Sequence, residues 1–192
     1  MERIEQLVDQ ALDAMLAKEP ILRMSPGNIH PDMLDGTITP LDDWRGWKPI
    51  PSIITDADLD RLERDMGVAL PGSYKHFLKH KHFLSLRLPD IAIQLPHHPP
   101  DTELQKLRAM VFNSWDPDLL IGRKYIYFAD FHDYGLLCFD ANKPGSGNEY
   151  PVVWMDHEDL EVALDYASDF RDLLESDPER GNRFIERLNA MR

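Results

Sequence analysis

Three histidines fall close together, and their spacing is the first feature of the sequence that could support chemistry. His76 and His80 lie four residues apart in a predicted helix, with His82 close by. This spacing places two imidazoles on one helical face, as zinc sites need. A zincin helix carries glutamate directly after the first histidine, whereas Phe77 stands there in this chain. Lysines on both sides add positive charge, so the pattern favours a solvated basic helix face over a metal site.

Two further groups place acidic residues around a histidine. The first is His132 with Asp130 and Asp133, and the second is His157 with Asp156, Glu158 and Asp159. Either group could transfer protons as a general acid or base. The second group leads into a predicted helix, where acidic side chains are expected as caps and dipole partners. We therefore expect these carboxylates to be structural or to contact a partner, rather than to catalyse a reaction.

Patterns for nucleophilic catalysis or nucleotide binding are absent from the sequence. It contains no G-x-S-x-G elbow, no G-x-x-x-x-G-K-[ST] loop and no G-x-G-x-x-G turn. The single cysteine, Cys138, has apolar neighbours, which predict a buried and unreactive thiol. One cysteine also excludes an intrachain disulfide and favours a reducing cytoplasm. We expect no enzyme activity and no cofactor, with a metal-dependent enzyme as the weakest alternative.

The net charge of the 192 residues is −13, and its distribution constrains the partner. Such a surface repels phosphate backbones and anionic lipids, so we expect neither nucleic acid nor a membrane as partner. No apolar run is long enough to span a bilayer, and the charged first residues do not form a signal peptide. The segment 71–125 carries +3, whereas 151–192 carries −6. Acidic flanks that meet in the fold would form a docking surface for a basic partner, or would serve only solubility.

The hydrophobic pattern predicts helices and strands in an order typical of an α+β domain. Residues 1–18 carry one apolar stripe and end before Pro20. A Pro/Gly-rich connection follows over 20–54, anchored by Trp44 and Trp47. Further helices are predicted at 55–66, 72–83, 101–112, 159–175 and 178–190, and strands at 91–95, 125–128, 135–139 and 152–155. Residues 130–135 are predicted to form a hairpin loop. We expect a mainly antiparallel sheet of about 4–6 strands flanked by helices, with an extra N-terminal amphipathic helix.

Several motifs in order resemble the SUKH superfamily, the Smi/Knr-type domain. Residues 59–78 resemble its E-x-x-(L/M)-G-x-x-LP-x-x-Y-x-x-FL signature. The segments 126–129, 135–140, 150–154 and 167–174 resemble its later strands and closing helix. The resemblance spans 44–176, so we expect an N-terminal helix and connection at 1–43 and a C-terminal helix packed on the domain at 177–192. The long segment 96–123 and the extra helix 1–18 depart from the family pattern.

The resemblance implies a non-catalytic binding module. Many bacterial members resemble immunity proteins, which neutralise a toxin, often a nuclease, by direct contact. Fungal relatives are regulators, so a regulatory or scaffold domain that uses helix 1–18 for docking or self-association is the alternative. We expect a cytoplasmic immunity protein, monomeric or homodimeric, that binds a basic toxin domain. The expected contacts are Asp130, Asp133, Asp156, Glu158 and Asp159, chosen for charge and expected exposure near the sheet edge.

Overall fold

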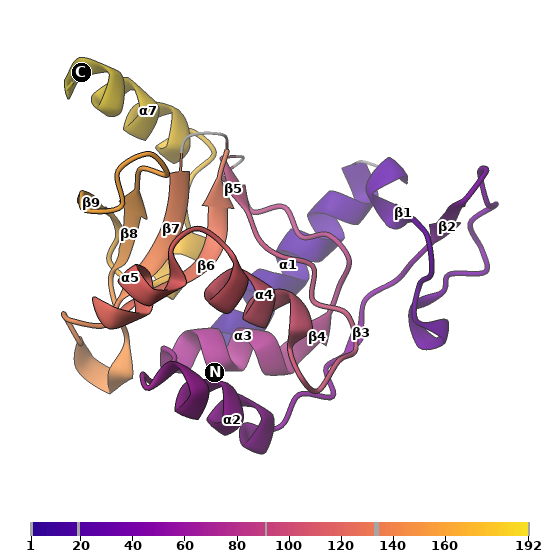
Figure 1. Cartoon of the computed structure of the whole chain (residues 1–192). Helices are drawn as coiled ribbons and strands as arrows, with labels where there is room; N and C mark the ends of the chain where they lie inside the picture. The colour runs from indigo at the N-terminus through magenta and orange to yellow at the C-terminus, as the bar shows by residue number, and fades with distance from the viewer. Residues whose placement is uncertain (1, 19, 91, 133–134, 192) are drawn as a thin grey trace.

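The computed structural model describes residues 2–18, 20–90, 92–132 and 135–191, and its centre is a five-stranded antiparallel sheet. Its strands, in spatial order, are β5 (Ile93–Gln94), β6 (Tyr125–Phe131), β7 (Gly135–Asp140), β8 (Val152–Met155) and β9 (Ala163–Ala167). Each strand pairs with its neighbour in the sequence (Figure 1). The predicted α+β class and antiparallel sheet are confirmed.

Helices cover both faces of this sheet (Figure 1). They are α1 (Glu2–Lys18), α2 (Asp56–Met66), α3 (Gly72–His80), α4 (Gln105–Asn113), α5 (Pro117–Gly122), α6 (Phe170–Leu174) and α7 (Arg180–Met191). Short strands β1 (Met24–Pro26), β2 (Trp44–Gly46), β3 (Ile50–Pro51) and β4 (Lys81–His82), and 3-10 turns η1 (Pro20–Arg23), η2 (Pro31–Met33) and η3 (Ser146–Asn148), complete the fold. Among the described helices, none is long and apolar enough to cross a membrane.

The two faces of the sheet bury different side chains, because successive residues of a strand point in opposite directions. One face is aromatic: Phe128 and Phe139 stack at 4.0 Å between ring centroids and contact Tyr74 of α3 and Phe170 of α6. The other face is mainly aliphatic and lies under α5. Its fully buried members are Leu120, Tyr127, Leu136, Cys138, Val153 and Met155. The predicted burial of Cys138 is confirmed, and burial raises the pKa of its thiol.

The helix α1 covers the main core, as its apolar stripe predicts. Ile4, Val8 and Leu12 are buried, and the helix packs against α3 and α6. On its polar side, Asp9 accepts a hydrogen bond from Lys81 at 2.7 Å and pairs with His80 Nε2 at 2.8 Å. Burial raises the pKa of Asp9, but these two partners outweigh burial and hold it below its usual value. The buried part of the stripe is therefore used within the chain, whereas Leu7 and Ala11 are only half-buried.

The helix α2 begins and ends as its sequence predicts. Thr55 accepts a hydrogen bond from the Asp58 amide, while the Asp58 carboxylate accepts one from the Thr55 amide, which forms a capping box. Gly67 ends the helix in the left-handed region with φ of 69°. The caps at both ends of α2 fix where the chain turns into α3. The aromatic side chains of α3 fill the core.

The predicted helix 159–175 is wrong. Residues 163–167 instead form β9, which pairs with β8 through Trp154 and Leu164. The apolar spacing suits a helix, but β8 would otherwise have an unpaired edge, and pairing overrides helix preference. The helix α6 begins only at Phe170, after Asp169, which accepts a hydrogen bond from the Asp172 amide at 2.8 Å.

Other boundaries also differ from the predictions. The helix predicted at 72–83 ends at His80, because Lys81 and His82 pair with β3. β6 extends to Phe131, so Asp130 lies in a strand rather than in a hairpin loop. The predicted strand 91–95 is reduced to β5, with Ile91 outside the described residues. The helix α5 was not predicted.

Residues 20–47, which we call the arm, contain short regular elements rather than an irregular connection. β1 and β2 pair within the arm and lie on the far side of α1 from the five-stranded sheet (Figure 1). Trp47 is buried and its indole nitrogen donates to the Leu22 carbonyl at 2.8 Å. Trp44, in contrast, is 37% exposed. Trp47 therefore anchors the arm as predicted, and the prediction is wrong for Trp44.

Candidate functional site

The histidines that first suggested a metal site are separated by the fold. His80 pairs with Asp9 of α1, whereas His82 faces into the domain and packs against His98 at 4.6 Å between ring centroids. Within the described ranges, no three side chains of histidine, cysteine, aspartate or glutamate are grouped as a metal site needs. His80 and His82 therefore make separate contacts within the fold.

The buried pair His82 and His98 ties residues 50–54, which follow the arm, to the rest of the domain. His82 accepts a hydrogen bond from the Ile53 amide at 3.0 Å and donates to the His98 carbonyl at 3.1 Å. His98 donates to the Leu78 carbonyl at 2.8 Å. Burial lowers the pKa of both histidines, to about 4 for His98, because a charged imidazole is poorly solvated there. Both rings are therefore neutral near pH 7.

The turn between β8 and β9 carries most of the acidic residues singled out in the sequence. Asp156 accepts a hydrogen bond from the Glu158 amide at 2.9 Å, and Asp159 accepts one from the Glu161 amide at 3.1 Å. Such aspartate turns satisfy the local backbone. The side chain of Arg123 donates to the carbonyls of Leu160 and Glu161, at 3.0 and 3.2 Å. Two aspartates and one arginine therefore fix the shape of this turn.

A tryptophan lies against this turn. Trp115 is 49% exposed and its ring lies 5.5 Å from that of His157, between centroids. Its φ of 56° is in the left-handed region, which costs a tryptophan on the order of 1–3 kcal/mol. Asp116 follows as the N-cap of α5, with its carboxylate accepting from the Leu119 amide at 3.0 Å. The chain therefore holds Trp115 half-exposed in a strained conformation, which the contacts of its side chain with His157 and with the Tyr127 hydroxyl support.

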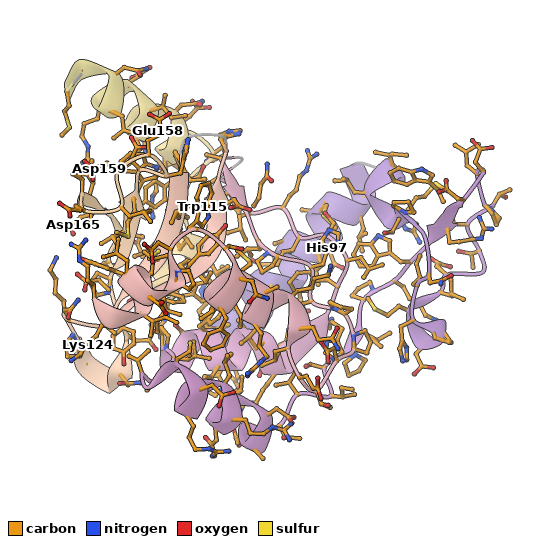
Figure 2. The ribbon with its side chains drawn as sticks, in the orientation of Figure 1. His97, Trp115, Lys124, Glu158, Asp159 and Asp165 are labelled. Carbon is orange, nitrogen blue, oxygen red and sulfur yellow. The ribbon has the colours of Figure 1, made fainter. Side chains whose placement is uncertain are left out.

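The β8–β9 turn and the first turn of α5 carry exposed acidic side chains, which together form what we call the acidic surface. It consists of the exposed residues Asp116, Asp118, Glu158, Asp159 and Glu161. None of them forms an ion pair with any residue that the structure describes. Glu158, Asp159 and Trp115 lie toward the upper end of the sheet in Figure 2. The surface thus combines an exposed aromatic ring with unneutralised negative charge.

The structure brings together only part of the predicted contact set. Glu158 and Asp159 are exposed on the acidic surface, and Asp156 is half-buried beneath them. Asp130 is half-buried in β6 and accepts a hydrogen bond from the Tyr127 hydroxyl. Asp133 lies outside the described residues. The acidic surface is therefore centred on the second of the two acid–histidine groups.

Sequence reasoning missed the other members of this surface. Trp115, Asp116 and Asp118 belong to a segment that was treated only as a long insertion, and Glu161 was assigned to a helix. One signal was present: Asp116 followed by Pro117 is typical of a helix start, because proline suits the first helical position. That signal locates α5 and places Asp116 and Asp118 in its first turn.

Comparison with known families agrees with the fold and motifs. A family model described as SMI1 / KNR4 family (SUKH-1) matches residues 53–176, which is more than half of the chain. The chain belongs to this family. The SUKH-1 match includes the five-stranded sheet and the acidic surface, whereas α1, the arm and α7 lie outside it. A search of curated proteins gave no match.

Proposed function

We propose that this SUKH-1 protein is an immunity protein that neutralises a toxin by binding a basic domain of it through the acidic surface. The observation that carries the proposal is the exposed Trp115 ring among carboxylates that have no cationic partner in the described part of the chain. Unneutralised negative charge attracts a basic protein over a distance comparable to the Debye length and accelerates association.

The two components of the site would act at different steps of binding. The carboxylates of Glu158, Asp159 and Glu161 would steer the partner and set the association rate. Trp115 would become buried in the complex, because tryptophan provides a large rigid contact area and is enriched among residues that dominate binding energy. Its aromatic face also attracts lysine and arginine side chains. Steering therefore depends on salt, whereas residence time depends on the ring.

Charge reversal tests the steering role. The variant with Glu158→Lys, Asp159→Lys and Glu161→Lys should bind the cognate toxin domain with an association rate at least tenfold lower than the wild-type protein at low salt. Stopped-flow fluorescence over a series of salt concentrations measures this rate.

A matched control changes the same amount of charge elsewhere. Asp13, Asp60 and Glu103 are exposed and form no ion pair with described residues, so Asp13→Lys, Asp60→Lys and Glu103→Lys shift the net charge of −13 equally. This control should retain most of the association rate. Equal slowing by both triples would show that only net charge matters, and tight binding unaffected by the first triple would place the contact elsewhere.

The strained tryptophan allows a sharper test. Trp115→Gly removes the ring and also relieves its left-handed backbone. We expect the free energy of unfolding to stay equal or rise by up to about 1 kcal/mol, while dissociation from the partner becomes at least tenfold faster. Urea unfolding and surface-based binding kinetics measure the two effects. Loss of stability with unchanged dissociation would assign Trp115 a purely structural role.

A further inference from the structure

A bulge in β6 determines where the Asp130 side chain points. The register of β6 against β7 shifts between Tyr127 and Ala129, so that Phe128 is an extra residue without a partner of its own in β7. In a regular strand, residues three apart point to opposite faces of the sheet. The extra residue instead turns Asp130 onto the same face as Tyr127.

The partners of these two residues in β7 agree with this placement. Tyr127 lies opposite Cys138, and Asp130 lies opposite Leu136. Cys138 and Leu136 both belong to the aliphatic layer under α5. Opposite residues of antiparallel strands place their side chains on the same face. Tyr127 and Asp130 are therefore neighbours on that face, and the Tyr127 hydroxyl donates a hydrogen bond to the Asp130 carboxylate.

The Tyr127 hydroxyl also contacts the side chain of Trp115. The indole N–H can donate a hydrogen bond but cannot accept one, so the hydroxyl oxygen is the acceptor in this contact. The proton of the hydroxyl is directed to Asp130. Burial and the Asp130 carboxylate raise the pKa of Tyr127, which therefore keeps this proton near pH 7. A continuous chain of contacts thus leads from Trp115 through Tyr127 to Asp130.

This chain restrains a ring that its own backbone does not favour. Trp115 has a φ of 56° and is half-exposed, so contacts of its side chain must determine its orientation. The ring of His157 lies beside the indole ring, and the hydroxyl of Tyr127, which is itself buried, lies at the indole nitrogen. A ring that is restrained in both ways loses little rotamer freedom when a partner covers it.

We propose that Tyr127 and Asp130 are positioning residues for partner binding, which hold the Trp115 ring in the orientation that contacts the partner. Asp130 acts through Tyr127, and this role differs from the direct contact that the sequence predicts for it. The inference rests on the proposed function, because it requires Trp115 to be buried in the complex. Without the restraint, the indole would have to be immobilised on binding, which weakens binding about threefold to tenfold.

Dissociation kinetics test the effect on binding. Tyr127→Phe removes both hydrogen bonds but keeps the ring, so the complex with the cognate toxin domain should dissociate about threefold to tenfold faster. The association rate should not change, because no charge is altered. Tyr125→Phe, which removes a hydroxyl from the same face of β6, is the matched control and should behave like the wild-type protein.

Two substitutions of Asp130 separate positioning from direct contact. Asp130→Ala removes the acceptor for the Tyr127 hydroxyl and should accelerate dissociation as much as Tyr127→Phe does. Asp130→Asn removes the charge but keeps an oxygen that accepts from this hydroxyl. It should therefore retain the wild-type dissociation rate.

NMR spectroscopy of the free protein tests the positioning itself. The indole N–H signal of Trp115 is assigned by its loss in Trp115→Phe. In Tyr127→Phe and Asp130→Ala this signal should move upfield and exchange faster with water, because the hydrogen bond is lost or weakened. In Asp130→Asn it should stay in place. The indole signals of the buried Trp47 and Trp154 serve as internal references.

The possible outcomes distinguish this inference from the proposed function. An unchanged Trp115 signal in Tyr127→Phe would overturn the inference. So would dissociation that is accelerated by Trp115→Gly but not by Tyr127→Phe, a result that leaves the proposed function intact. Equal acceleration by Asp130→Asn and Asp130→Ala would assign Asp130 a direct charge contact instead. If Trp115→Gly did not change dissociation, the proposed function would fail, and this inference would fail with it.

Discussion

The acidic surface and the tip of the arm each expose a tryptophan, but the molecule supports the two side chains in different ways. Trp115 follows α4 and precedes α5, and α5 packs Leu120 into the aliphatic layer of the sheet. Trp44 lies on a two-stranded hairpin whose positions are fixed by hydrogen bonds, and the arm that carries it is anchored in the main core by the buried residues Met33 and Trp47. One surface therefore depends directly on the sheet, and the other on a hairpin that is tied to the core through these two side chains.

This difference follows the family boundary. The acidic surface lies inside the matched residues 53–176, and the arm lies outside them. The acidic surface is therefore carried by the family domain, and the exposed Trp44 by a segment that precedes it. Substitutions that act on only one of the two regions test this separation.

The largest effect is expected from the aromatic face of the sheet. Phe139→Ala should lower the free energy of unfolding by about 3–5 kcal/mol, because a large buried ring is lost and a cavity remains. Phe139 is fully buried and contacts aromatic rings from two helices. Urea unfolding measures the effect. Cys138→Ala, one residue away on the aliphatic face, is the matched control and should cost about 1 kcal/mol. Equal costs would contradict the difference between the faces.

The second effect is a pH dependence of stability at residues 50–54, which follow the arm. Burial lowers the pKa of His98 in the folded chain to about 4, whereas the pKa in the unfolded chain is about 6.5. The neutral, buried His98 therefore contributes its full stabilisation above pH 6.5, and this stabilisation is lost as the pH falls toward about 4. We expect a loss of up to about 3 kcal/mol across this window. Because His82 accepts from the Ile53 amide, hydrogen exchange should increase first at residues 50–54.

A variant separates this effect from general acid unfolding. His98→Gln retains a donor for the Leu78 carbonyl but does not titrate. In urea titrations run at each pH, its stability should fall less than that of the wild-type protein between pH 6.5 and 4.5, and His82, whose pKa is also lowered by burial, should account for part of the remaining loss. If the variant showed the full pH dependence of the wild-type stability, that dependence would come from groups other than His98.

A smaller, local effect is expected from Gly46. A Cβ at this position would lie 2.5 Å from the Cβ of Ile38 and 2.9 Å from the Asp35 carbonyl oxygen, so Gly46→Ala should displace the neighbouring turn. We expect about 1–3 kcal/mol of local destabilisation, seen as faster hydrogen exchange over 35–46. The exchange rates of β8 and β9 should not change. A matching increase there would show that the arm and sheet unfold together.

The smallest effect on stability is expected at the acidic surface. Reversing the charges of Glu158, Asp159 and Glu161 should lower the free energy of unfolding by about 1 kcal/mol, mostly because Asp159 no longer accepts a hydrogen bond from the Glu161 amide. The exposed charges of Glu158 and Glu161, which have no ion-pair partner among the described residues, should contribute little. Thermal unfolding at two salt concentrations measures this. A large loss would mean that these carboxylates stabilise the β8–β9 turn beyond their backbone contacts.

Local signals in the sequence were sufficient for much of the fold. The stripe of α1 and the capping box at Thr55 depend on neighbouring residues, and both predictions are confirmed. β9 was missed because its pairing with β8 is a tertiary effect that the helical spacing of 159–175 conceals. The resemblance of residues 167–174 to the closing helix of the family did not correct this error, because it concerns the helix that follows β9 and not the strand itself.

The candidate site was harder to predict than the fold. The second acid–histidine group was found, since clustered charge is visible in sequence. Trp115 was not found, because only the fold shows that it contacts His157 across a long sequence separation. The exposure of Trp44 was also unexpected, since a tryptophan beside Trp47 suggests two anchors rather than one.

Two of the four tryptophans of the chain provide an optical reporter for each of the two regions compared above. Trp47 and Trp154 are shielded in the interior, whereas Trp44 and Trp115 are accessible to a soluble quencher such as acrylamide. Replacing Trp44 by phenylalanine leaves Trp115 as the accessible emitter, and the reverse replacement leaves Trp44. If quenching of Trp115 disappears on adding a partner and quenching of Trp44 does not, the binding event is located at the acidic surface in an unlabelled protein.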